Sequence, residues 1–128
     1  MENEIINILI VDDDEDICWV IKKVFRQDNF FIKCANNGAQ ALALITKFNF
    51  NVAILDAKLP DIDGLSLATL TRQTHPYIQI IIISGYYTAE DEIILEGIKK
   101  GSFDFFVSKP FELDTLRQVI QQQKNLLD

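Results

Sequence analysis

The sequence has few residues of the kinds that build zinc, disulfide or membrane sites. Its 128 residues include one histidine and two cysteines, Cys18 and Cys34, which do not form a C-x-x-C pair. Without a Cys/His cluster there is no zinc-binding pattern, and we expect both cysteines to be free thiols in a reducing cytosol. No apolar run approaches the length of a membrane span. The first seven residues carry two acids and no basic group, so we expect no signal peptide and a cytoplasmic location.

Basic residues are also scarce. Lys and Arg number 12 against 19 Asp and Glu, and the formal net charge is −7. Sequence-independent binding of nucleic acid needs a basic surface, so we expect no direct nucleic-acid binding. Hydrophobic residues make up 48% of the chain, which is enough for a core without a disulfide or a structural metal. We therefore predict a single domain over residues 1–128.

Five apolar runs of strand character alternate with segments of helical spacing. The strands are expected at residues 5–11, 30–35, 51–56, 78–83 and 103–108. A helix is expected after each of them. Thr88 and Asp91 form an approximate capping box that would begin the fourth helix, and Gly101 would close it. This alternation predicts an α/β fold of the flavodoxin-like doubly wound type, with a five-stranded parallel sheet in the order 2-1-3-4-5 and helices on both faces.

Three carboxylates follow the first and third strands, where this strand order reverses. Asp12 and Asp13 follow the first strand, and Asp56 ends the third. Ligands of doubly wound sheets bind at this edge. Taken alone, Asp56 is explained equally well as a cap of the next helix. Three converging carboxylates repel one another, however, and a bound Mg²⁺ or Mn²⁺ would relieve that repulsion.

Two further side chains are expected at the same edge of the sheet. Ser84 follows the fourth strand and Lys109 follows the fifth, so a hydroxyl donor and a positive charge would lie beside the carboxylates. Such a set suits phosphoryl transfer. Asp56 would be the nucleophile, while the metal, Lys109 and Ser84 would neutralise the charge of the transferring group.

With these motifs in place, the sequence resembles the receiver domain of two-component response regulators over essentially its whole length. The resemblance is carried by an ordered set of strand-end motifs: I-L-I-V-D-D-D at 8–14, L-D-A-K-L-P at 55–60 with D-G at 63–64, S-G at 84–85, and K-P-F at 109–111. Each motif alone is a weak signal, and the specificity comes from their order.

The resemblance implies a phosphoacceptor signalling domain rather than an enzyme that acts on other molecules. A histidine kinase or histidine phosphotransfer protein would donate the phosphoryl group to Asp56. Asp13, Asp56 and the backbone carbonyl of Lys58 would bind Mg²⁺ (or Mn²⁺), and Asp12 would complete the acidic pocket. The domain would catalyse its own phosphorylation and its slow dephosphorylation.

The resemblance also assigns residues that contact, report and tune the modification. Ser84 would contact the phosphoryl group and Lys109 would pair with it. Lys58 and Tyr86 lie two residues after Asp56 and Ser84, positions that border the path of attacking water. We expect these two residues to tune the lifetime of the phosphorylated state. The alternative is that they are two solvated loop side chains.

The segment before Lys109 departs from the family pattern by one extra residue. The aromatic switch residue is Phe106 when it is counted back from Lys109, or Phe105 when it is counted forward from Gly101. We favour Phe106, because the distance from Lys109 fixes which residue borders the site. A bulge in the fifth strand would absorb the extra residue. Either phenylalanine lacks a hydroxyl group, so switching would depend on packing. The Lys109-Pro110 bond is often cis in the family.

The sequence indicates the surface through which the domain signals less specifically than it indicates the acidic site. We expect phosphorylation to alter the surface of the last strands and helices, where a homodimer or an output domain would bind. The chain is either a stand-alone regulator or a receiver cut from a longer protein.

Three alternative functions remain. A flavodoxin-type binding protein would need a Ser/Thr/Gly-rich phosphate loop where this chain is acidic. A phosphatase of the haloacid-dehalogenase class would need a threonine after its D-x-D motif. A degenerate receiver used only as an interaction module is the third alternative.

Overall fold

The computed structural model describes residues 5–26 and 28–127, with side chains up to residue 122. Strands and helices alternate as β1 (Ile6–Val11), α1 (Glu15–Val24), β2 (Phe30–Ala35), α2 (Gly38–Lys47), β3 (Val52–Asp56), α3 (Gly64–Thr74), β4 (Gln79–Ser84), α4 (Glu92–Lys100), β5 (Phe105–Ser108) and α5 (Leu113–Leu127). In the part of the chain described, no helix is long and apolar enough to cross a membrane. The expected absence of a signal peptide depends partly on residues 1–4, which lie outside the described residues.

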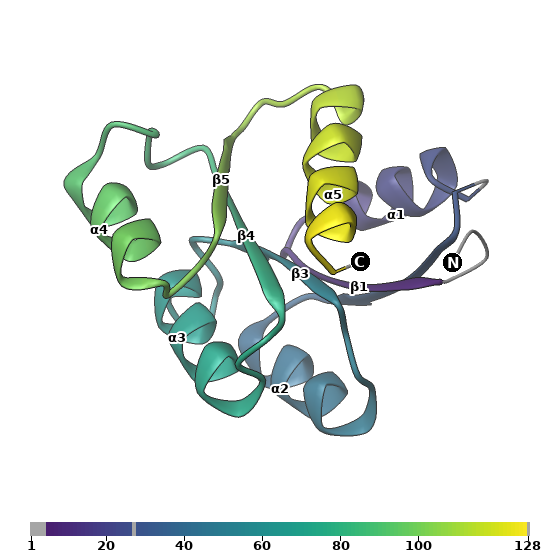
Figure 1. Cartoon of the computed structure of the whole chain (residues 1–128), viewed down its shortest axis with the longest axis horizontal. Helices are drawn as coiled ribbons and strands as arrows, with labels where there is room; N and C mark the ends of the chain where they lie inside the picture. The colour runs from purple at the N-terminus through teal and green to yellow at the C-terminus, as the bar shows by residue number, and fades with distance from the viewer. Residues whose placement is uncertain (1–4, 27, 128) are drawn as a thin grey trace.

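The strands form one parallel sheet in the order β2-β1-β3-β4-β5, so the predicted fold class is confirmed. Figure 1 shows α1 and α5 on one face of the sheet and α2, α3 and α4 on the other. Each face has its own apolar core, with Phe25 and Leu116 in the first and Leu67 and Ile94 in the second. The strand order reverses between β1 and β3, and their carboxyl ends therefore border the crevice.

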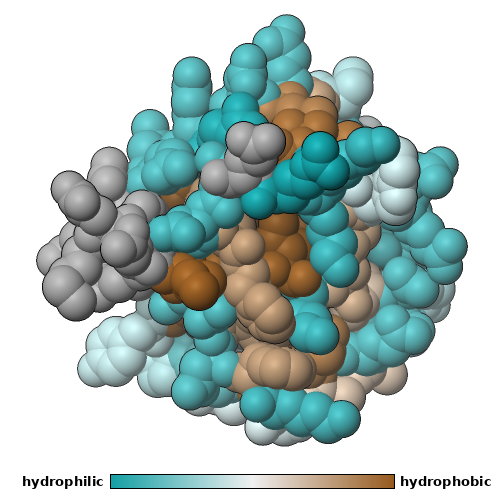
Figure 2. Space-filling view, turned by 90° about the vertical axis from the view of Figure 1, so that its right-hand side faces the viewer, coloured by the Kyte–Doolittle hydropathy of each residue, from teal (hydrophilic) through white to brown (hydrophobic). Residues whose placement is uncertain are grey.

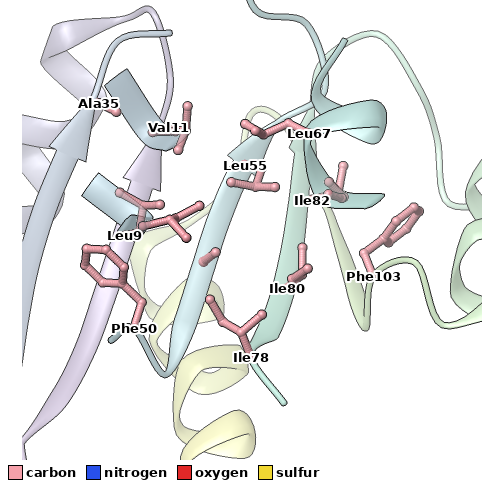
Figure 3. Packing of buried hydrophobic residues seen from close by; sticks show 14 of the residues in the cluster. Leu9, Val11, Ala35, Phe50, Leu55, Leu67, Ile78, Ile80, Ile82 and Phe103 are labelled. Atoms are coloured by element: carbon pink, nitrogen blue, oxygen red, sulfur yellow. The ribbon is translucent and has the colours of Figure 1, made fainter. Parts of the chain in front are cut away.

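The central strands β3 and β4 are the most buried. Every residue of β3 is buried, as are the last five residues of β4. Strands covered by helices on both faces read as continuous apolar runs, which is why both were visible in the sequence. Figure 3 shows Leu55, Ile80 and Ile82 from these strands within one apolar group, with Phe50 and Phe103 at its two ends. The acceptor candidate thus ends a strand that is held from both sides.

The start of α4 differs from the prediction. The helix begins at Glu92 with Asp91 as its N-cap, three residues after the predicted cap at Thr88. The Asp91 carboxylate accepts a hydrogen bond from the Thr88 backbone N–H at 2.8 Å, and the Asp91 N–H donates to the Thr88 carbonyl at 3.2 Å. These bonds close a separate turn, because short acidic side chains compete with the helix for local backbone groups. The predicted end is correct, since Gly101 caps α4 in the left-handed conformation with φ 79°.

The fifth strand is shorter than predicted and contains no bulge. Its ladder with β4 runs without interruption from Ile81–Phe105 to Ser84–Ser108, so the expected bulge is wrong. Phe103 lies outside the strand and is buried against α4 at Gly97, where an added Cβ would overlap the Phe103 ring. The extra residue is therefore accommodated before the strand, where Phe103 packs under α4.

The expectation of two free thiols is also wrong. Cys18 of α1 and Cys34 of β2 are joined as a disulfide, with their Cα atoms 6.2 Å apart. This separation lies within the range that a disulfide spans. The sequence did not indicate the pair, because 16 positions separate the two cysteines and only the packing of α1 on β2 brings them together.

Candidate functional site

The predicted site residues meet at the carboxyl edge of the sheet. Asp12 directly follows β1, Asp56 ends β3, Ser84 ends β4 and Lys109 directly follows β5. Asp12, Asp56 and Ser84 are buried, with 1%, 7% and 1% of their surface exposed. Parallel strands end on the same side, so four separate segments supply one site.

Lys109 bridges two of the carboxylates. Its Nζ lies 2.8 Å from Asp12 Oδ2 and 3.2 Å from Asp56 Oδ2. The remaining oxygens are held by backbone groups of the following loops: Asp12 Oδ1 accepts from the Asp14 N–H at 2.9 Å, and Asp56 Oδ1 accepts from the Lys58 N–H at 3.2 Å. Both carboxylates are therefore fixed in position and compensated by one lysine.

Burial and charge shift the pKa values of this group. Burial raises the pKa of Asp12, although the hydrogen bonds from Lys109 and from the Asp14 backbone act in the opposite direction. Burial by itself would lower the pKa of Lys109, but its hydrogen bond and charge contact with Asp12, followed by those with Asp56, outweigh burial and raise it. Lys109 thus stays protonated while Asp12 binds protons more readily than an exposed aspartate.

The acidic residues fit a divalent cation. Asp12, Asp13 and Asp56 can each direct one carboxylate oxygen so that all three oxygens lie within 4.8 Å of one another. Small hard cations such as Mg²⁺ prefer oxygen ligands of this kind and keep waters at the remaining positions. Asp13 is exposed, so water can reach the group from its side. One lysine cannot neutralise three carboxylates, and the remaining negative charge favours a bound cation.

The loop that follows β4 fixes the hydroxyl group of Ser84 through backbone hydrogen bonds. Its oxygen accepts hydrogen bonds from the N–H groups of Tyr86 and Tyr87, both at 2.9 Å. A serine hydroxyl has two acceptor positions and one hydrogen to donate. Since both acceptor positions are used, the function that remains to Ser84 at the site is donation.

The loop between β3 and α3 brings its backbone against the acceptor. Gly64 donates its N–H to the Ala57 carbonyl at 2.8 Å, and Lys58 pairs with Asp63 in an isolated antiparallel bridge. A Cβ at Gly64 would overlap the carbonyl oxygen of Asp56, so only glycine allows this approach. The loop therefore places Lys58 directly beside the acidic group.

Asp61 of the same loop was missed by the sequence analysis. Its two oxygens accept from the backbone N–H groups of Gly38 and Ala39, at 2.8 and 3.0 Å, at the start of α2. These two hydrogen bonds lower the pKa of Asp61, because they stabilise its charged form. No signal could have found this contact, since a carboxylate rarely caps a helix 23 positions away.

The profile of the response regulator receiver domain family matches residues 8–121. This chain belongs to that family. The regulatory protein AtoC of Escherichia coli (strain K12) is 33% identical over 119 residues, which cover 93% of this chain and 25% of AtoC. Sporulation initiation phosphotransferase F of Bacillus subtilis (strain 168) is 33% identical over 122 residues, which cover 95% of this chain and 94% of that protein.

Solved structures agree with this assignment. The response regulator protein TrrA from Thermotoga maritima, determined in complex with Mg(2+)-BeF, matches with a TM-score of 0.80 and 27% identity, covering 93% of this chain and 99% of that chain. Receiver domains are phosphoacceptor signalling domains of two-component systems that bind Mg²⁺ at an acidic site and are phosphorylated by histidine kinases. The chain spans about a quarter of the length of the first curated relatives that it matches.

In this receiver domain, Lys58 of the β3–α3 loop contacts two tyrosines of the β4–α4 loop. Lys58 Nζ lies 4.3 Å from the centroid of the Tyr86 ring and 5.3 Å from that of Tyr87. The two tyrosine rings meet edge to face with centroids 4.8 Å apart. Lys58 and Tyr86, the two residues predicted to tune the lifetime, are therefore in contact. Tyr87 contacts both of them.

The two candidate switch residues of the receiver domain face opposite sides of the sheet. Phe106 packs against the apolar cluster that contains Ile94, which Tyr87 also contacts, whereas Phe105 packs against the cluster on the face of α1 and α5. Phe106 therefore contacts the same apolar group as the loop that Ser84 holds. The choice of Phe106 as the switch residue stays a prediction.

An apolar groove of about 510 Å³ opens beside Lys109. The receiver domain lines it with residues of α1 and of the β5–α5 loop: Asp16, Ile17, Val20, Ile21, Lys109, Pro110, Phe111 and Leu113. The Lys109-Pro110 bond in its wall is cis, as the family resemblance implied. The groove is therefore an apolar surface next to the acidic site.

Proposed function

We propose that Asp56 accepts a phosphoryl group from a phosphohistidine of a histidine kinase or histidine phosphotransfer protein, in a reaction that needs Mg²⁺ (or Mn²⁺). The observation that carries this proposal is the surroundings of Asp56. It ends the central strand β3, contacts Lys109 at 3.2 Å and belongs to the group of three carboxylates.

The chain's own residues would act as follows. An oxygen of Asp56 attacks phosphorus while the bond from phosphorus to the histidine nitrogen breaks, and the imidazole leaves with that electron pair and takes up a proton. Asp13, Asp56 and the backbone carbonyl of Lys58 hold the cation, with Asp12 completing the pocket. The bound cation supplies positive charge to the phosphoryl oxygens.

Lys109 and Ser84 complete the stabilisation of charge. The Lys109 ammonium pairs with a phosphoryl oxygen, and the Ser84 hydroxyl donates its free hydrogen to another. Attack of water on the phosphorylated Asp56 reverses the modification slowly, so the domain catalyses both its own phosphorylation and its dephosphorylation. The contact between Lys58 and Tyr86 covers the approach of that water and tunes the lifetime.

Phosphorylation would act on the partner surface through packing. Ser84 and Phe106 report the modification to the face of α4, β5 and α5, where a homodimer or an output domain binds. The donor protein docks on the groove beside Lys109. Residues 1–128 act as one receiver unit in the cytoplasm, and the net charge of −7 supports the expectation that this unit does not bind nucleic acid itself.

A small phosphoryl donor tests the proposal without knowledge of the cognate kinase. Incubation with acetyl phosphate and Mg²⁺ should add one phosphoryl group, measured by intact mass, and chelation of the cation should prevent it. Asp56→Asn should show no addition, while Asp114→Asn, at a side chain that is 83% exposed, should behave as wild type. Phosphorylation of Asp56→Asn would identify a different acceptor. No addition to wild type would leave the interaction module as the function.

A further inference from the structure

The disulfide between Cys18 and Cys34 joins two elements that flank the acidic loop. Cys34 precedes Ala35, the last residue of β2, whose carbonyl accepts the Asp12 N–H at 3.1 Å. Cys18 lies in the second turn of α1, and that helix is capped by Asp14. The covalent bond therefore fixes α1 against the strand that supports Asp12.

The two cysteine residues differ in exposure. Cys18 is buried, with 9% of its surface exposed, whereas Cys34 is only partly buried. Cys34 lies in β2, an edge strand that pairs only with β1 among the described strands. Figure 2 shows the side of the molecule that lies at the right in Figure 1, with hydrophobic residues through the middle of the face between hydrophilic ones. A reagent in solution can reach Cys34 more readily than Cys18.

We propose that Cys18 and Cys34 form a reversible thiol–disulfide site, oxidised by a small-molecule disulfide of the glutathione class. Disulfides of proteins in a reducing compartment are mostly transient or redox-sensing rather than permanent. The pair needs no movement of the backbone to close, because the 6.2 Å separation of the Cα atoms already suits the bond. This site goes beyond phosphorylation and uses none of the residues assigned to it.

The difference in access sets the order of the two steps. The Cys34 thiolate attacks one sulfur of the small disulfide, whose S–S bond breaks, and the first small thiolate leaves and takes a proton. The Cys18 thiolate then attacks Cys34 Sγ and displaces the second small thiol. Two protein thiols are oxidised, and one small disulfide is reduced to two thiols. Cys34 is the entry residue and Cys18 is the resolving residue.

Closing this bond should stabilise the domain. It links residues 16 positions apart, and a cross-link of that span removes freedom from the unfolded chain. For a domain of this size we expect the melting temperature to rise by about 10 °C on oxidation. The stabilisation is global, so amide exchange in the buried strand β4, which requires global opening, should slow on oxidation.

Glutathione buffers of graded redox poise test the proposal, with intact mass and alkylation of free thiols as readouts. Wild type should lose two hydrogens under oxidising conditions, carry no adduct at equilibrium, and regain both thiols in excess reduced glutathione. Cys18→Ala should trap one glutathionyl group on Cys34. Cys34→Ala should stay unmodified, because Cys18 is buried. The double variant should melt at the same temperature in both buffers.

Three results would overturn the proposal. Wild type could keep two free thiols in oxidised glutathione, or form adducts without the internal bond. The disulfide could also survive excess reduced glutathione, which would make it a permanent structural bond. Asp56→Asn should oxidise as wild type does, so a failure of this site and a failure of the phosphorylation proposal are separate observations.

Discussion

The Nζ atom of Lys109 lies 2.8 Å from Oδ2 of Asp12, although 97 positions separate the two residues in the sequence. The contact joins the segment after β5 to the segment after β1. It places a cation where three carboxylates meet, so the lysine takes part of the role that a bound metal ion would have. Stability and metal binding should therefore depend on each other.

Lys109→Met tests this dependence. Removing the cation leaves buried carboxylates without compensation, so the free energy of unfolding should fall by about 2 kcal/mol in the absence of Mg²⁺. The loss should be smaller with saturating Mg²⁺, measured by urea unfolding in both conditions. Lys100→Met is the control, since that side chain is 67% exposed and pairs only with Glu96 in the structure described. Equal losses for Lys109→Met in both conditions would contradict the argument.

Mg²⁺ affinity should fall on acidification. Burial raises the pKa of Asp12 above 3.8, so protons displace the cation at a higher pH than at an exposed aspartate. The stability of the metal-free domain responds in the opposite direction: the contribution of protonated Asp12 is present at low pH and lost as the pH rises through the raised pKa. Titrations from about pH 8 to about pH 5, followed at the Asp14 and Lys58 amide signals, should show the decrease. Asp12→Asn should bind more weakly with less dependence on pH, and a constant wild-type affinity would refute this.

Gly64→Ala should disturb the acceptor through the backbone. The added Cβ overlaps the Asp56 carbonyl oxygen and the Ala57 backbone, neither of which can move without breaking β3 contacts. We expect a loss of about 3 kcal/mol in unfolding free energy and slower phosphorylation of the folded fraction. Ser66→Ala, at an exposed position of the same helix, should stay within about 0.5 kcal/mol of wild type. A fully stable Gly64→Ala would show that the loop can move away.

Asp104→Ala should lower the free energy of unfolding, although Asp104 lies away from the acidic site. Its Oδ2 accepts from Arg72 at 2.5 Å and from the Ile80 N–H at 2.8 Å, and both side chains of the ion pair are largely buried. Truncation should cost about 2 to 3 kcal/mol, because it removes the carboxylate partner of the guanidinium group and leaves the Ile80 N–H without its acceptor. Asp114→Ala, at an exposed ion pair with Arg117, should cost less than about 1 kcal/mol. Similar losses in the two variants, measured by thermal or urea unfolding, would refute the distinction.

Lys58 and Tyr86 should act as a pair on the decay of the phosphorylated state. Their contact at 4.3 Å means that removing either one opens the same path for water. We expect Lys58→Ala and Tyr86→Ala each to change the decay rate severalfold, and the double variant to change it by less than the product of the two effects. Loss of label from phosphorylated protein measures the rate. Unchanged decay rates in both single variants would mean that the two residues are solvated loop side chains without a tuning function.

The strand order and the site were both predictable because they depend on the same local pattern. Each apolar run ends where the burial of its strand ends, and the polar residue that follows is placed at the sheet edge by the fold alone. Asp56, Ser84 and Lys109 were therefore found without knowledge of any contact between them. Their convergence in the structure follows from strand order, which the βα alternation had already indicated.

The contacts that were missed depend on two elements meeting. Asp61 caps α2 across 23 positions, and Cys34 reaches Cys18 only because α1 packs beside β2. The start of α4 was misplaced for a different reason, since Asp91 uses its carboxylate to close a turn with Thr88. A capping pattern in the sequence does not show which of two neighbouring acidic or hydroxyl residues will begin the helix.

The burial of β3 has a consequence for how this domain can signal. All of its residues are buried, and Leu55 is paired with both β1 and β4, while Asp56 is paired with Ile83 of β4, so the peptide backbone at Asp56 cannot shift without disturbing the β3–β4 ladder. A chemical change on that carboxylate must leave the sheet as it is. The structural difference between the two states then belongs to the loops that surround the carboxylate, while the strand that carries it keeps its place in the sheet.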